Sequence, residues 1–203
     1  RGMKKKWERD LEMLERFCFH YHAIGKQQAV RVEKKYSEYA IKIEKLNEIG
    51  NDDDRSTSLE TVLREMRDDL VGVKREYVQL DNFTQRFNEE LDYSKPSKRL
   101  LVKYALSRIN HHYENGTGEM SVDLGMVNLE HILPQNPKKW GLNKEDVEDY
   151  VNKIGNLTMI SKKINSTMGN KGLKNKLDLI SGSELSINAN LIDFIENHGN
   201  KWT

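Results

Sequence analysis

The sequence predicts a mostly helical α+β protein, in which an all-helical part precedes a smaller part with two short strands. Before residue 93, apolar side chains recur every three or four positions, which is the spacing of one helix face. After residue 93, two strand-like runs appear, Met126–Ile132 and Asn156–Ser161. We therefore expect a helical connector or interaction segment over residues 1–93 and an α+β unit over residues 94–203.

The first part contains amphipathic helices separated by polar breaks. The spacing of apolar residues predicts helices from Lys4 to about Ala23 and from Gln27 to Ile49. Thr57–Glu60 has the Thr-x-x-Glu spacing of a capping box, which predicts a helix start, and helical spacing continues to about Asp92. The run Asp52–Asp54 before it is expected to be a solvated loop.

The second part begins after a break at Tyr93–Ser97, a segment that contains Pro96 and is the best linker candidate. A helix is expected from about Ser97 to Tyr113. Between the two strands, a short helix is expected from Asn143 to near Gly155. After the second strand, the pattern predicts one helix from about Lys162 and another from about Ser186 to Asn197.

Composition excludes several classes of protein. The formal net charge is +1, so a nucleic-acid partner must be argued from local charge. Cys18 is the only cysteine, which excludes an intramolecular disulfide and a thiolate metal cage and suits a reducing compartment. No apolar run approaches the ~18 residues that a membrane span needs, and the basic N-terminus is not followed by the apolar stretch of a signal peptide. We expect a cytoplasmic protein with no membrane partner.

The residues that suggest chemistry lie where the two strands meet the helix that follows them. Glu130 and His131 end the first strand, and Asn165 lies on that helix. Phosphodiester hydrolysis needs a base for the attacking water and a hard cation to neutralise charge. His131 suits the base because its ordinary pKa is near ~6.5, and the oxygens of Glu130 and Asn165 suit Mg²⁺ or Mn²⁺. Adjacent strand residues point to opposite faces, so Glu130 and His131 share a site only if a bulge or the strand end turns one of them.

Local charge is the second signal of function. Between Val151 and Leu177 the chain contains several lysines and no aspartate or glutamate. Such a cluster can contact phosphates, which position a duplex without reading its sequence. We therefore expect double-stranded DNA as the partner, with little intrinsic sequence preference. The lysines expected to contact it are Lys162, Lys163, Lys171, Lys174 and Lys176.

These motifs together resemble a known family. Glu130–Gln135, with its His-x-x-Pro core, is similar to the C-terminal domain of GmrSD-type modification-dependent restriction proteins, which belongs to the HNH, or ββα-metal, nuclease superfamily. Trp140, Gly155–Thr158 and Asn165–Lys176 share the resemblance, which covers roughly residues 98–203.

The resemblance implies a ββα-metal core surrounded by helices and a metal-dependent DNA endonuclease or nickase that serves in restriction or phage defence. His131 would be the general base, and Asn156 would brace the loop that presents it. Asn165 would be a metal ligand, and Glu130 stands where many relatives have a ligating aspartate. Family members usually carry an upstream nucleotide-hydrolysing domain, which would be this chain's partner. The final Trp202 resembles the start of the family's last helix, so a truncated C-terminal end is expected.

Other interpretations remain open at the level of sequence. The chain can be an inactive ββα module that binds nucleic acid or a partner, or an RNase toxin with the same site. Asn156 after Gly155 can simply shape a turn, and each lysine can be part of a solvated face. His20, His22, His111 and His112 are expected to be surface residues, because their spacing places no pair on a shared helix face.

Overall fold

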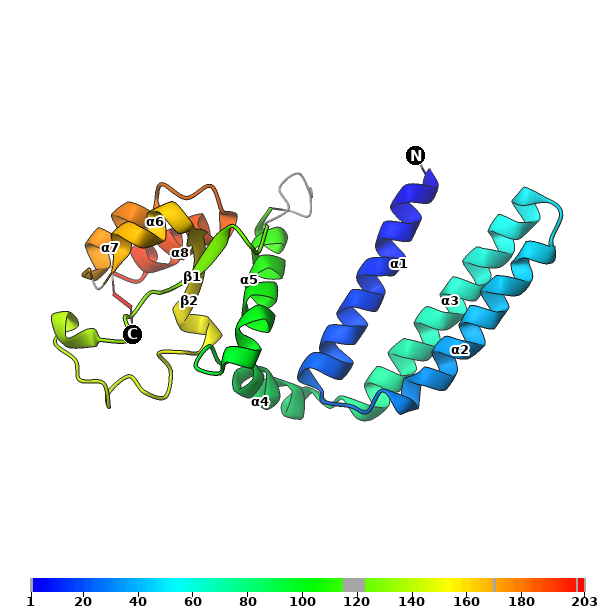
Figure 1. Ribbon diagram of the computed structural model, residues 1–203, viewed down its shortest axis with the longest axis horizontal. Coiled ribbons are helices and arrows are strands. Elements are labelled where there is room, and N and C mark those ends of the chain that lie inside the picture. Colours follow the sequence, from blue (N-terminus) through cyan, green and yellow to red (C-terminus); the bar gives the residue numbers. More distant parts are fainter. Residues whose placement is uncertain (1, 115–122, 170, 200, 203) are drawn as a thin grey trace. The chain divides into compact units, whose positions relative to one another are not determined.

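The computed structural model describes residues 2–114, 123–169, 171–199 and 201–202. The chain divides into two compact units, Arg1–Glu90 and Leu91–Thr203, which we call the helical unit and the sheet unit. Helices predominate, and the described residues contain one two-stranded antiparallel sheet (Figure 1), so the α+β expectation is confirmed. None of the helices in the described part of the chain is long and apolar enough to cross a membrane.

The described residues of the helical unit form four α-helices and short helical turns. Helix α1 (Gly2–Cys18) runs directly into a π-helical turn, Phe19–Ile24, and is followed by α2 (Val30–Lys45), α3 (Asp52–Tyr77) and α4 (Leu80–Glu90). Helices α2 and α3 run antiparallel side by side (Figure 1). Lys35 Nζ and Tyr39 Oη both donate to Asp69 Oδ2 across that pair, at 2.8 and 3.0 Å. Buried apolar residues form the core: Phe17, Tyr21, Val32, Tyr39, Leu63, Met66, Leu70 and Val73.

The start of α3 differs from the sequence expectation. The helix begins at Asp52, and the Asn51 side chain accepts hydrogen bonds from Asp53 N at 2.8 Å and Asp54 N at 3.3 Å. Thr57 caps nothing, because its hydroxyl donates to the Asp53 carbonyl within the helix. The predictions of a solvated loop at Asp52–Asp54 and of a capping box at Thr57–Glu60 were therefore wrong. Asn is among the best N-cap residues, and carboxylates in a first turn are favoured by the helix dipole.

The sheet unit surrounds a small antiparallel sheet with helices (Figure 1). Its elements are α5 (Arg99–Tyr113), β1 (Val127–His131), β2 (Leu157–Ser161), α6 (Lys162–Met168), α7 (Leu173–Ile180) and α8 (Ser186–Asn197). The register places Glu130 opposite Thr158 and His131 opposite Leu157. The helix expected from Asn143 to Gly155 was wrong: this segment consists of turns that end in a 3-10 turn, Ile154–Asn156.

Two apolar clusters and two buried asparagines hold this unit together. Ile132, Ile160, Met168 and Ile180 form one cluster, while Leu133, Val147 and Val151, the last two from the segment of turns, form another. Asn188 accepts from the Thr158 hydroxyl at 2.5 Å and donates to the Met159 carbonyl, which fixes α8 to β2. Asn110 accepts from Ile187 N at 3.0 Å and joins α5 to α8. The strand end that carries His131 therefore lies on a fixed support.

Replacing Asn51, the observed N-cap of α3, should lower the free energy of unfolding more than replacing Thr57, the residue that the sequence predicted as the cap. Asn51→Ala removes the acceptor for two backbone N–H groups, so it should lower the free energy of unfolding by about 1 kcal/mol. Thr57→Ala, at an exposed position within the helix, should change it by less than about 0.5 kcal/mol. Urea unfolding followed by circular dichroism measures both. A larger loss for Thr57→Ala would contradict the assigned cap.

Candidate functional site

The histidine at the end of β1 is held in one tautomer. His131 Nε2 lies 3.0 Å from Asn152 Oδ1, and the same oxygen accepts a hydrogen bond from Gln135 Nε2 at 2.9 Å. Because an amide oxygen only accepts, Nε2 must carry the proton of the neutral imidazole. The lone pair is then on Nδ1. The ring can accept a proton there while its other nitrogen stays bonded to Asn152.

Asn152 is itself positioned by the segment that the sequence suggested as a linker. Tyr93 N donates to the Asn152 carbonyl at 2.9 Å, and Asp92 pairs with Lys153 both as a β-bridge and as an ion pair of 2.9 Å. The Tyr93 ring also contacts the His131 imidazole edge to face, with centroids 5.4 Å apart. Sequence reasoning missed Tyr93 and Asn152, since neither belongs to a recognisable motif and Asn152 lay within an expected helix.

The surroundings of His131 favour its neutral form. Burial lowers the pKa of the imidazole below its ordinary value, and the nearby Lys176 ammonium lowers it further, while the hydrogen bond to Asn152 acts in the opposite direction. A histidine whose pKa is lowered is unprotonated at neutral pH. This is the protonation state that a general base requires.

Lys176 and Glu130 form a buried ion pair beside this histidine. Lys176 on α7 is 1% exposed, and its Nζ donates to Glu130 Oε1 at 2.6 Å and to the His131 carbonyl. The prediction that Lys176 contacts DNA was therefore wrong, because its side chain is buried. One of the two Glu130 carboxylate oxygens that were expected to bind a metal accepts a hydrogen bond from Lys176 instead. The reason is visible in the sequence: Leu173, Lys176 and Ile180 share the three- and four-residue spacing of the apolar face of α7.

Asn156 joins three segments around the loop after His131. Its amide Nδ2 donates to the carbonyls of Leu133 and Val151, at 2.9 and 2.8 Å, and its Oδ1 accepts from Leu133 N and from the Trp202 indole, both at 2.9 Å. The side chain is buried, and these bonds satisfy its amide groups, as buried polar groups require. Asn156 thus fixes the backbone two residues beyond His131.

The other expected ligand and the lysines lie on the helices after β2. Asn165 is half-buried on α6, next to Ile164 and three residues before Met168, which pack on the core beside Ile132 and Ile160. Ser161 caps this helix by accepting from Ile164 N at 3.3 Å. Within the described residues, no group of three or more His, Cys, Asp or Glu side chains could hold a metal ion. The lysines exposed to solvent are Lys162, Lys163, Lys171 and Lys174.

Removing the charge of the buried Lys176 should lower the free energy of unfolding far more than removing the charge of the exposed Lys174. Lys176→Met leaves the Glu130 carboxylate without its partner, and such a change typically costs about 3–5 kcal/mol of unfolding free energy. The double variant Lys176→Met/Glu130→Gln should recover part of that loss because both charges are gone. Lys174→Met, exposed on the same helix, is the control and should cost less than about 0.5 kcal/mol. Equal losses for the two single lysine variants would rule out a stabilising buried pair.

Comparison with known proteins gives one match. The model of the family described as GmrSD restriction endonucleases, C-terminal domain, matches residues 77–203, which is more than half of the chain. Among curated proteins and among solved structures, nothing matches the chain. The resemblance carried by the Glu130–Gln135 motif is thereby confirmed at the level of the family. The chain belongs to the family of C-terminal domains of GmrSD restriction endonucleases.

Proposed function

We propose that the sheet unit is a DNA endonuclease of the HNH type, in which His131 is the general base. The observation that carries this proposal is the hydrogen bond between His131 Nε2 and Asn152, which leaves the Nδ1 lone pair to accept a proton. The lowered pKa of His131 supports the same role, because it keeps the ring unprotonated at neutral pH. Membership of a restriction endonuclease family supports DNA as the substrate.

In the proposed reaction, water attacks the phosphorus atom while its proton passes to His131 Nδ1. The bond from phosphorus to one ester oxygen breaks, and that oxygen leaves with the electron pair. Asn152 Oδ1 then accepts from the imidazolium as it did from the neutral ring, so the ring keeps its orientation as it gains charge. Lys176 holds the backbone at the His131 carbonyl, and Asn156 holds it two residues later at Leu133.

We propose Mg²⁺ or Mn²⁺ as the cofactor, with Asn165 and Glu130 as its protein ligands. The residues fit such an ion in part: Asn165 offers an amide oxygen, whereas Glu130 Oε1 is engaged by Lys176 and only its second oxygen is without that bond. Mg²⁺ commonly takes one or two protein ligands and completes its shell with water and substrate phosphate. When bound, the ion would neutralise charge on the phosphate.

The four exposed lysines are proposed to guide the duplex. Lys162, Lys163, Lys171 and Lys174 lie in a stretch without carboxylates, on and between α6 and α7. Contacts of this kind are made to phosphates, so they carry no sequence information. We propose that the recognition of modified DNA, and any regulation, belong to an upstream nucleotide-hydrolysing domain of the kind that the family resemblance implies.

Loss of the His131 side chain should abolish most cleavage and leave the fold intact. His131→Ala should reduce nicking of supercoiled plasmid by about 10²–10⁴-fold, which is the usual contribution of a positioned acid–base group. The assay is run with Mg²⁺, with Mn²⁺ and with EDTA, and circular dichroism checks folding. His198→Ala, at an exposed histidine of the same unit, is the control and should cleave normally.

A folded His131→Ala protein that nicks at the wild-type rate would falsify the assignment of the base. Wild-type protein that binds DNA without cleaving it would favour an inactive binding module. Faster digestion of RNA than of DNA in a parallel assay would favour the RNase interpretation.

Reversing the charge of the exposed lysines should weaken DNA binding for every sequence alike. Lys162→Glu, Lys171→Glu and Lys174→Glu together should reduce the slope of log affinity against log salt by about 0.9 for each phosphate that the protein no longer neutralises. The matched control combines Lys138→Glu, Lys139→Glu and Lys144→Glu, which are also exposed in the sheet unit but outside the carboxylate-free stretch. Equal effects of the two triple variants in a titration with labelled duplex would show that only net charge matters.

A further inference from the structure

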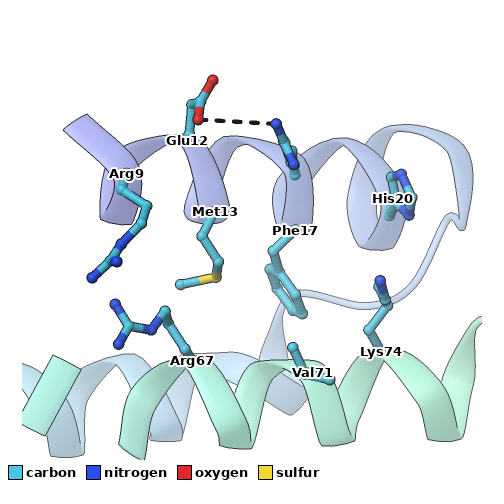
Figure 2. A pocket seen from close by; sticks show the side chains of 9 residues that line it. Arg9, Glu12, Met13, Phe17, His20, Arg67, Val71 and Lys74 are labelled. Carbon is cyan, nitrogen blue, oxygen red and sulfur yellow. Dashed lines mark ion pairs between the residues drawn. The ribbon is translucent and has the colours of Figure 1, made fainter. Parts of the chain in front are cut away.

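The helical unit contains a hollow, which is a groove between α1 and α3. It encloses about 700 Å³, which is within the range of ligand pockets. Figure 2 shows Arg9, Met13 and Phe17 extending from α1 toward α3, and Arg67, Val71 and Lys74 extending from α3 toward α1. His20 closes one end from the π-helical turn, a type of irregularity that is frequent at functional sites. We call this feature the α1–α3 groove.

Basic side chains line the two ends of the α1–α3 groove, and at each end one of them, Arg9 or Lys74, has no ion-pair partner among the described residues. Arg9 and Arg67 lie at one end, and Lys74 lies at the other beside His20 (Figure 2). Arg67 is paired with Asp10, whereas no ion pair joins Arg9 or Lys74 to a carboxylate among the described residues. The one acidic lining residue, Glu12, points away from α3 and pairs with Arg16 at 3.9 Å (Figure 2). The groove is therefore complementary to an anion.

The centre of the α1–α3 groove is apolar. Met13 and Phe17 from α1 face Val71 from α3, and these three side chains separate the two charged ends (Figure 2). A ligand that fits must carry anionic groups at both ends and a less polar part between them. Lys74 and Arg16 also place positive charge near His20, whose pKa is lowered first by burial and then by these two charges.

The distance between the charged ends matches a nucleic-acid strand. Arg67 and Lys74 are seven positions apart on α3, which corresponds to about 10 Å along a helix axis at ~1.5 Å per residue. A stacked strand advances about 3.4 Å per nucleotide, so phosphates about three nucleotides apart reach both ends. A duplex turns its phosphates outward and stacks its bases inside, and therefore has no apolar part to offer to the centre. Single-strand binding grooves combine the same two elements, a cationic track and an apolar or aromatic platform.

We propose that the α1–α3 groove is a binding site for about three consecutive nucleotides of single-stranded DNA. The phosphates bind Arg9 at one end and Lys74 at the other, and the intervening sugar or base lies on Met13, Phe17 and Val71. The site is separate from the residues proposed for cleavage. A single strand becomes available wherever a duplex is opened or nicked, so the groove gives the helical unit a substrate-holding function beyond that of a connector.

The test measures binding of a fluorescein-labelled ten-nucleotide thymidine strand to the full chain by fluorescence anisotropy, in EDTA and at several salt concentrations. Arg9→Ala/Lys74→Ala should raise the dissociation constant about tenfold and reduce the salt slope by about 1.4, since each phosphate neutralised on a single strand contributes about 0.7. The control Lys34→Ala/Arg75→Ala also removes one arginine and one lysine of the helical unit, at exposed positions outside the groove, and should change the constant less than twofold. Circular dichroism verifies that all variants fold.

A third variant tests the apolar centre without changing charge. Val71→Asn should weaken binding of the thymidine strand while the salt slope stays at the wild-type value. Three outcomes overturn the proposal: equal losses in the two double variants, an equal loss for a duplex of the same length, or displacement of the strand by inorganic tripolyphosphate at lower concentration than by a thymidine trinucleotide. Since EDTA prevents metal-dependent cleavage, a negative result here leaves the plasmid-nicking test of His131 unaffected.

Discussion

The buried ammonium of Lys176 is the interaction on which the architecture of the candidate site depends. This charged group can be buried because the Glu130 carboxylate and the His131 carbonyl both accept hydrogen bonds from it. Through these two bonds α7 is tied to the side chain of one β1 residue and to the backbone of the next. The strand end cannot shift relative to α7 without exposing an unpaired charge to an apolar core, which would cost several kcal/mol.

This constraint operates together with two amide side chains. Asn156 fixes the backbone at Leu133, just beyond the His131 carbonyl that Lys176 fixes, and Asn152 fixes the ring of His131. A catalytic base must be held in one orientation while its charge changes, and neutral amides can do this without altering the charge of the site. The same arrangement reduces the negative charge available for a cation, because the Glu130 carboxylate is already compensated by Lys176. Much of a metal's coordination shell would then have to come from substrate phosphate and water.

The sequence predicted the fold class and the two strands because these depend on local periodicity and on a motif. The strands Val127–His131 and Leu157–Ser161 lie within a residue of the expected ends on every side. Helix α8 was predicted at its observed bounds for the same reason. In contrast, the start of α3 was predicted wrongly from the Thr-x-x-Glu spacing at Thr57, because the N-cap is Asn51, whose side chain accepts hydrogen bonds from two backbone N–H groups.

The candidate site was only partly predictable, because its residues meet through tertiary contacts. His131 and Asn156 belong to a motif, but Asn152 and Tyr93 reach the histidine only after the chain has folded back as turns rather than as the expected helix. Lys176 was assigned to the surface from its charge alone. Its position on the apolar face of α7 could have indicated burial, since a helical lysine between Leu173 and Ile180 has its stem in the core.

Near-neutral composition conceals the way charge is distributed in this chain. The 33 basic and 32 acidic residues almost cancel in the sum, but a field is set by charges within a Debye length, about 8 Å at physiological salt. The acidic residues Asp52–Asp54 lie at the start of α3. Counted from Asp53, Arg67 lies 14 positions further along the helix and Lys74 lies 21 positions further. At ~1.5 Å per residue these separations are about 20 and 30 Å, so the acidic turn stabilises its own helix end without neutralising the basic groove on the same helix. The absence of any carboxylate between Val151 and Leu177 has the same effect in the sheet unit. A balanced total charge is therefore compatible with two locally positive surfaces, one in each unit.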